Sequence, residues 1–496
     1  MGTRIFTRPN FEKLPVIRGL LRKLNFYKCV QESLKWRHVN CDGKELIKNT
    51  PSESEKIELH CAWVTEAFTP SNINKLINLL EKIGWDNCEK NIGEEDSLIK
   101  WIKEGRSFSG SDSWMNGGVI LSRSDTSRFP VSNIRRTKLP ENVDYGRLSI
   151  RNVTPSLTLV TIQFVFKSEV DDCLNELLKA SYKSKIQYRP SIFNAKSAIY
   201  VGVIEQKREA IEKKINEIHA PLYSWFNDNL PGYYFSSGGA MPTVDMITSR
   251  VYEQSEQNPS NFRDSYFDLM FNHNMELWQC KEDRNLELRL SRRNSEEPTA
   301  ILFGNYNKLI QGLGNNGGED RGALTNKIHM DFVFTLSLWV THNLLINYDQ
   351  QLSIIRDKMI FIIEETKKSL KSLDYIRYNF LSVSTDIQIL SNDLAMSIKR
   401  KLYSYDCIDF DPPSYLGIIS FMELMKQQDE IKMKQLVASE FRVNQLILSS
   451  GNIASAIANL RIQGRMFWIA VVGIILALLS IIISIIVAIY KDGFFN

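Results

Sequence analysis

Clustered metal-ligating residues are absent from this sequence of 496 residues. Its seven cysteines include no pair at CxxC spacing, and its six histidines show neither HxxxH nor HExxH spacing. A disulfide framework, a zinc ribbon and a zinc-dependent active site are therefore not indicated. The scattered cysteines are typical of small buried hydrophobic residues in a reducing compartment.

Signatures of the common enzyme classes are also missing. The sequence has no GxSxG, no Walker lysine loop and no kinase motif. Gly312, Gly314 and Gly317 satisfy GxGxxG, but their polar and acidic neighbours favour a linker over a nucleotide site. No catalytic residue, metal ligand or cofactor is predicted, which leaves an enzymatic activity unsupported rather than excluded.

Charge of one sign is not in large excess. The formal net charge of +4 is too small to indicate nucleic acid as the main partner. Two basic clusters and a glycine loop are candidates for binding phosphate on a small ligand or a lipid headgroup. These candidate ligand-binding residues are Arg135, Arg136, Lys138, Arg289, Arg292, Arg293, Gly238 and Gly239. The alternative for each is an ordinary charged surface or loop, and the carboxylate pair Asp171-Asp172 is interpreted as a helix cap.

One long hydrophobic run is present near the C-terminus. Met466–Tyr490 is uncharged, and about 25 helical residues reach about 37 Å, enough to cross a hydrocarbon core of about 30 Å. Arg461 and Arg465 precede the run, which favours a single-pass C-terminal anchor with the N-terminal part in the cytosol. The first 40 residues have no apolar core after their basic residues, so no signal peptide is predicted. Phe332–Ile346 is apolar but too short to span, and we expect it to be buried.

Small residues follow one face of the membrane run at steps of three and four. They are Ala470, Gly473, Ala477, Ser480 and Ser484. Small residues let membrane helices approach closely, so we expect self-association along this face. In a symmetric oligomer the two serines would face a narrow pore. A monomeric anchor with incidental small residues is the alternative.

The C-terminal third has the periodicity of long helices. Apolar residues from Leu345 to Leu394 recur at alternating steps of three and four, interrupted only by Thr366 and Ser369. This spacing predicts one long helix with a continuous seam. Asp411–Ser414 then breaks the helix, and a second helix is expected from about Tyr415 into the membrane run, completing an antiparallel hairpin.

The N-terminal part reads as α/β. Ile57–Val64 and Leu157–Phe166 are predicted strands, each followed by an amphipathic helix, and Ser197–Ile204 starts a third such unit. Two similar units indicate duplicated ferredoxin-like halves. Leu286–Leu290 and Thr299–Phe303 read as a hairpin, which makes the sheet mixed.

Together these patterns predict an α+β chain: a mixed-sheet α/β domain, then a long helical hairpin or coiled coil that runs into one transmembrane helix. The expected segments are a cytosolic domain over 1–310 with a subdomain boundary near 150, a Gly/Asn-rich linker over 311–328, a coiled-coil helix over 329–410, a stalk over 411–465, the membrane helix over 466–490 and a tail over 491–496.

This layout resembles the CorA-type divalent-cation channels. Tyr415–Tyr490 matches the stalk and first membrane helix of that family, which implies a homo-oligomer that conducts ions. The family's Gly-Met-Asn signature is missing, because Tyr490-Lys491-Asp492-Gly493 follows the membrane run. A second membrane helix is also missing, so no ion-selecting residue is assigned from the resemblance.

The function expected from the sequence is that of a self-associating membrane sensor or effector, of the kind found in stress or phage defence. Its cytosolic domain would bind a ligand, such as a small phosphorylated molecule, and control a membrane helix that conducts ions or disrupts the bilayer. Two alternatives stay open. One is a tail-anchored scaffold that recruits a soluble partner, and the other is a membrane-tethered enzyme acting on a nucleotide.

Overall fold

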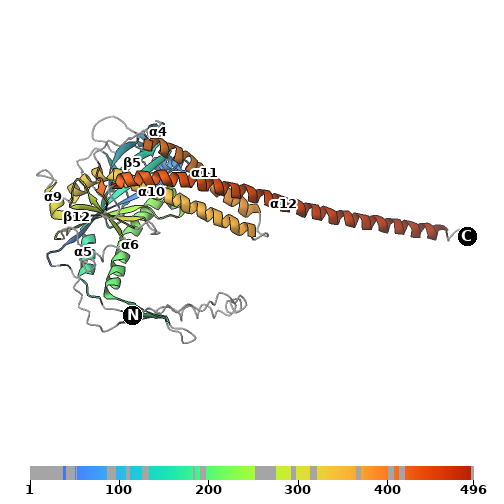
Figure 1. Cartoon of the computed structure of the whole chain (residues 1–496), viewed down its shortest axis with the longest axis horizontal. Coiled ribbons are helices and arrows are strands. Elements are labelled where there is room, and N and C mark those ends of the chain that lie inside the picture. Colours follow the sequence, from blue (N-terminus) through green and yellow to red (C-terminus); the bar gives the residue numbers. More distant parts are fainter. Residues whose placement is uncertain are drawn as a thin grey trace.

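A computed structural model describes residues 37–40, 51, 53–86, 97–107, 112–125, 133–182, 185–189, 197–251, 275–291, 298–312, 321–364, 370–399, 407–412 and 419–492. Within these residues the chain is α+β, as the sequence predicts. A mixed sheet is packed between helices, and one very long helix leaves the body toward the C-terminus (Figure 1).

Ten strands form the main sheet, in the order β13-β10-β11-β12-β9-β2-β6-β5-β3-β4. They are β2 (Ile57–Phe68), β3 (Ser113–Ser122), β4 (Ile134–Thr137), β5 (Val143–Thr154), β6 (Leu157–Phe166), β9 (Thr243–Ser249), β10 (Met275–Cys280), β11 (Leu286–Ser291), β12 (Thr299–Asn305) and β13 (Phe410–Asp411). Neighbours are antiparallel except for the parallel pairs β9–β12 and β3–β4. The predicted β11–β12 hairpin is confirmed. A separate three-stranded sheet contains β1 (Arg37–Asn40), β7 (Lys185–Arg189) and β8 (Ser197–Val201).

The two halves of the main sheet share a strand order but not strand directions. Each half places its first strand beside its last, as β2-β6-β5-β3 and β9-β12-β11-β10. However, β2 runs antiparallel to β6, whereas β9 runs parallel to β12. The expected duplication therefore holds for strand order only. Because β2 pairs with β9 at the centre and β5 runs across position 150, the sheet is continuous where a subdomain boundary was expected.

Helices cover both faces of the sheet. They are α3 (Ile73–Lys82), α4 (Leu98–Ser107), α5 (Glu169–Lys179), α6 (Val203–Asn229), α7 (Tyr233–Ser237), α9 (Tyr306–Gln311), α10 (Arg321–Glu364), α11 (Leu370–Lys399) and α12 (Phe421–Asp492). Neighbouring residues of β6 show the two layers. The Phe164 ring packs 5.7 Å from Trp225 of α6, while Gln163 Nε2 donates to the Thr325 carbonyl of α10 at 3.0 Å. Adjacent strand residues point to opposite faces, so α6 and α10 enclose the sheet.

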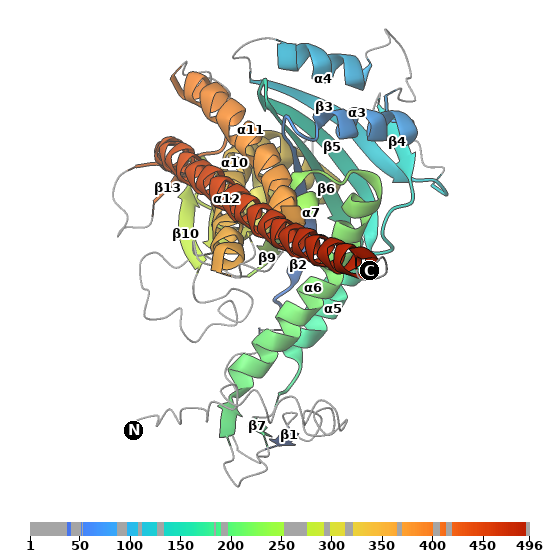
Figure 2. The same ribbon diagram turned by 90° about the vertical axis from the view of Figure 1, so that its right-hand side faces the viewer.

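The long apolar seam is divided between two helices. We expected one helix through Leu345–Leu394, but α10 ends at Glu364 and α11 begins at Leu370. The interruptions at Thr366 and Ser369 fall between them, outside the described residues. The inward face was predicted correctly, since its buried members are Leu345, Tyr348, Leu352, Ile355, Met359, Ile376, Phe380, Ile387, Leu390 and Leu394. The two helices lie side by side (Figures 1 and 2). The reversal between them was not predicted, because heptad spacing specifies a buried face but carries no signal for a change of direction.

The helical third is not a separate domain. The predicted linker over 311–328 is helical from Arg321, and Leu324 and Ile328 are buried. Trp63 Nε1 of β2 donates to His329 Nδ1 at 2.9 Å, which ties α10 to the centre of the sheet. The apolar stretch 332–346 is largely buried, as expected from its length.

The stalk and the membrane segment are one helix. α12 has 72 residues, about 108 Å at about 1.5 Å per residue. It begins at Phe421, after the non-helical residues 419–420; the start expected near Tyr415 lies outside the described residues. Within it, Ile462–Ala488 is long and apolar enough to cross a membrane and is not buried against the body. This span projects far beyond α10 and α11 (Figure 1).

Candidate functional site

The first predicted basic cluster serves internal contacts. Arg135 on β4 is buried, and its Nε donates to the carbonyl of Trp85 at 3.2 Å. Arg136 donates from Nη1 to backbone carbonyls at the end of β3 and in the turn that follows. The carbonyl of Lys138 accepts a hydrogen bond from Trp225 Nε1 at 3.0 Å. These contacts stabilise the edge of the sheet. Both guanidinium groups donate hydrogen bonds to backbone carbonyls of the protein itself.

The second basic cluster lies far along the same sheet. Arg289 on β11 is buried, forms an ion pair with Glu287 and lies 5.5 Å from the Phe303 ring centroid. Arg292 and Arg293 lie outside the described residues. Because β4 is an edge strand and six strands separate it from β11, the two clusters do not form a common phosphate site.

The predicted glycines Gly238 and Gly239 line a cavity of about 800 Å³. Gly238 ends α7 with φ +70°, a conformation that glycine adopts without strain. The lining comes from the α7 loop, β10, β11, α10 and α12. It comprises Tyr234, Ser237, Gly238, Gly239, Ala240, Glu276, Trp278, Leu290, Pro298, Trp339, His342, Asn343, Ile346, Asn347, Asp349, Gln350, Gln351, Ser353, Ile354, Leu424, Met425 and Gln428. This volume suits a small-molecule ligand.

The short helix α7 is fixed between the sheet and α10. The buried carboxylate of Glu66 on β2 accepts hydrogen bonds from the backbone N–H groups of Tyr234 at 2.7 Å and Phe235 at 3.2 Å. Burial raises the pKa of Glu66 to about 7, although these hydrogen bonds oppose the rise. On the helical side, Gln351 Nε2 donates to the Ser237 carbonyl at 3.1 Å. Hydrogen bonds from β2 and from α10 therefore hold α7, which forms one wall of the cavity.

The opposite wall belongs to α12 and rests on polar contacts with α10. His342 Nδ1 lies 2.7 Å from Asp429 Oδ1, and Lys432 Nζ lies 2.6 Å from Asp349 Oδ2. Burial raises the pKa of Asp429, while the hydrogen bond from His342 opposes the rise. His342 and Asp349 also line the cavity. A ligand in the cavity would thus touch the groups that hold α12 in place.

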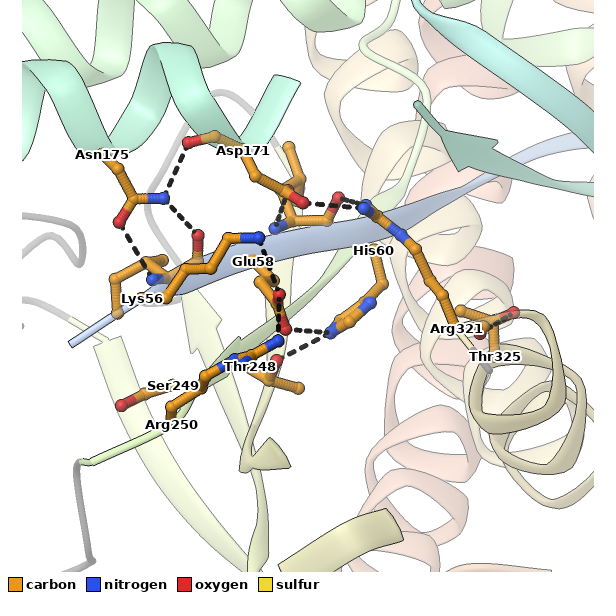
Figure 3. A network of polar contacts seen from close by, with 12 residues as sticks. Lys56, Glu58, His60, Asp171, Asn175, Thr248, Ser249, Arg250, Arg321 and Thr325 are labelled. Carbon is orange, nitrogen blue, oxygen red and sulfur yellow. Dashed lines mark hydrogen bonds and ion pairs between the residues drawn. The ribbon is translucent and has the colours of Figure 1, made fainter. Parts of the chain in front are cut away.

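A second polar cluster joins β2, α5 and α10 (Figure 3). Asp171 accepts from the Leu59 N–H at 2.8 Å and from Arg321 Nη1 at 2.7 Å, and burial raises its pKa to about 6 against the effect of that arginine. His60 Nε2 lies 2.6 Å from Thr248 Oγ1, and burial lowers its pKa well below the ordinary value. Asp171 therefore joins elements distant in sequence, beyond the helix cap inferred from its pairing with Asp172.

Most of the residues that line the cavity carry no recognisable sequence pattern. Amide and carboxylate side chains of α10, such as Asn343, Asn347 and Asp349, resemble an ordinary solvated helix face until α12 and β10 are placed opposite them. Only the Gly238–Gly239 loop was singled out. No family model matches this chain, and no curated protein matches it in sequence.

Proposed function

We propose that this protein is a membrane-anchored, self-associating sensor with its body in the cytosol. A ligand in the cavity changes the packing of α12, and α12 transmits that change to a membrane segment that conducts ions in the oligomer. The coupling is a population shift between two packings of one helix.

The continuity of α12 carries this proposal. Its residues Met425 and Gln428 line the cavity, and the same uninterrupted helix enters the membrane segment at Ile462. The distance from Gln428 to Ile462 along the helix is about 50 Å. Because the helix has no break between them, a tilt or rotation at the cavity is carried to the membrane.

The contact face of α12 supports a helix that can exchange packings. From Met422 onward, its buried residues in the described part follow steps of three and four and are Met422, Met425, Asp429, Met433, Leu436, Glu440, Val443, Ile447 and Ser450. Asp429 and Glu440 interrupt this otherwise mainly apolar stripe, and Glu440 Oε1 accepts from Ser384 Oγ at 2.5 Å. Buried ionisable groups carry a desolvation cost, so these layers bind α12 less tightly than apolar layers would.

The exposed end of α12 supports self-association. Leu460 is 66% exposed, which leaves an apolar residue uncovered on the stretch between the body and the membrane segment. All five small residues of the predicted packing face are exposed in the single chain. In lipid, such a face is available for close contact with the same helix of other copies.

Ion flux from liposomes tests the membrane half of the proposal. Leu436→Ala, which loosens α12, should raise K⁺ flux, and adding Ser480→Leu with Ser484→Leu should remove it by filling the pore face. The matched control is Ile475→Leu with Ile482→Leu on the opposite face of the same segment. Flux that survives the serine changes would exclude a pore along this face.

A helix break tests the coupling half. Ala456→Pro lies between the body and the membrane segment, and proline in a helix interior costs about 3 kcal/mol and kinks the helix. In the Leu436→Ala background it should return K⁺ flux to the level of the unsubstituted protein, whereas Ala456→Ser should leave the flux raised. Equal flux from both variants would show that the membrane segment acts independently of the body.

The outer face of α11 favours a second candidate, a tail-anchored scaffold. Five large apolar side chains lie exposed on this helix, with exposed fractions of 39–75%: Tyr375, Tyr378, Leu381, Ile389 and Met396. An apolar face of this kind fits a soluble protein partner. Replacing 466–490 with an unrelated polyleucine span separates the two functions, because a scaffold would keep working and an ion-conducting sensor would not.

A further inference from the structure

We infer that the cavity binds a small organic cation, an amine or guanidinium compound that also carries a hydrogen-bond acceptor. The inference rests on the proposed function, since it names the ligand of the same site. It replaces the phosphorylated ligand expected from the sequence with a ligand of opposite charge.

Charge favours a cation. The described residues that line the cavity include the carboxylates of Glu276 and Asp349 but no lysine or arginine. Glu276 forms no ion pair with any residue that the structure describes, and Asp349 has Lys432 as its partner at 2.6 Å from α12. The other titratable residues of the lining are Tyr234 and His342, and His342 contacts Asp429 of α12. A phosphate would meet two carboxylates here, whereas an ammonium or guanidinium group would be attracted to both.

The aromatic lining fits the same ligand class. Glu276 and Trp278 lie two residues apart on β10, so they share one face of the sheet, and Trp339 lies on α10 across the cavity. Cations are attracted to the faces of indole rings. Trp278 is fully buried, and its Nε1 donor has no partner among the described residues. A buried donor without a partner costs free energy, which an acceptor on the ligand would recover.

The geometry also explains how such a ligand would move α12. Asp349 on α10 is the acceptor for Lys432 of α12, and it lines the cavity. A ligand cation bound at Asp349 competes with Lys432 for the same carboxylate. Binding therefore removes one of the polar contacts that hold α12 on α10.

Calorimetric titration of the full chain in nanodiscs tests the ligand class. Argininamide, which has a guanidinium, an amine and a carbonyl, should bind more tightly than agmatine, which lacks the carbonyl. ATP should not bind. Glu276→Gln, nearly identical in shape, should weaken argininamide about tenfold through loss of a charge-assisted hydrogen bond. Asp357→Asn, an exposed carboxylate of α10 outside the cavity, is the control and should bind normally.

The outcomes separate this inference from the proposed function. Binding of ATP or adenosine in place of argininamide would overturn the cation inference, as would argininamide binding that Glu276→Gln leaves unchanged. If argininamide does not bind but Leu436→Ala still raises K⁺ flux, the inference of a cationic ligand is wrong and the proposed sensor function is retained. Argininamide binding at Glu276 without faster amide exchange in 421–450 would establish the cation site and remove the coupling to α12.

Discussion

The helix α10 has two contact faces that differ in kind. Toward the sheet, four side chains donate hydrogen bonds to it: Trp63, Arg147, Arg151 and Gln163. Arg151 is almost fully buried, forms an ion pair with Asp112 and lies 4.6 Å from the Phe334 ring centroid. These contacts join α10 to strands at the centre of the sheet. Any displacement of α10 would leave several buried donors without partners, so this face is fixed.

Toward α12 the same helix presents a simpler face. The buried stripe of α12, which packs on α10 and α11, is rich in methionine and interrupted by acidic residues such as Asp429. Methionine is flexible and tolerates changes of packing. From this difference we expect α12, and not α10, to be the helix that changes its packing.

The largest effect is expected on the fixed face. Arg151→Met removes one partner of a buried ion pair and leaves Asp112 unpaired, which should lower the free energy of unfolding by about 3–5 kcal/mol. Urea denaturation followed by tryptophan fluorescence measures it. Arg442→Met on the exposed surface of α12, where the guanidinium contacts only its own helix, should cost little. A similar cost for both variants would mean that the sheet face of α10 is not specially fixed.

A large but local effect is expected on the exchangeable face. Leu436→Ala leaves a cavity under α12, and core leucine truncations cost about 2–5 kcal/mol. Hydrogen exchange should accelerate in 421–450 and stay slow in the first half of α10. Val437→Ala changes the exposed neighbour, at 43% exposure, and is the control. If exchange accelerates equally in α10, the two faces form one cooperative unit.

A pH dependence is expected where α7 joins the sheet. Burial raises the pKa of Glu66 from an ordinary value of 4.5 to about 7. Its protonated form is favoured in the folded state, so its contribution to stability is complete below pH 4.5 and is lost as the pH rises toward 7. Urea denaturation between pH 4.5 and 7.5 should show a shallower decline of stability for Glu66→Gln than for the unsubstituted protein. Glu104→Gln, an exposed change on α4, should keep the full decline.

The smallest net effect is expected from replacing a polar layer completely. Asp429→Leu alone leaves His342 half-buried without its carboxylate and should cost about 1–3 kcal/mol. Asp429→Leu together with His342→Leu should be near neutral or stabilise α12, since apolar replacement of a buried pair often does so. Thermal unfolding and exchange in 421–450 measure both variants. A double variant as unstable as the single one would show that the pair itself stabilises the contact.

Local pattern alone predicted the strands β2, β6, β8, β11 and β12, the helices that follow β2, β6 and β8, the inward faces of α10 and α11, and the apolar end of α12. Strand alternation and helical periodicity depend on neighbours within a few residues, so one sequence suffices to predict them. The reversal between α10 and α11 was not predicted, because the heptad repeat here stays in register from one helix to the next. The polar residues Thr366 and Ser369 were the only interruptions of the apolar repeat.

The cavity and the roles of the charged residues were decided by the tertiary structure. The cavity is lined from the α7 loop, β10, β11, α10 and α12, which are far apart in the sequence and meet only because α10 lies across the sheet and α12 across α10. In the sequence Arg135 and Arg289 belong to basic clusters, yet both side chains are buried and bind other groups of the protein. Composition cannot distinguish an arginine that binds a ligand from one that stabilises the folded protein. The distinction depends on which groups, distant in sequence, surround the guanidinium.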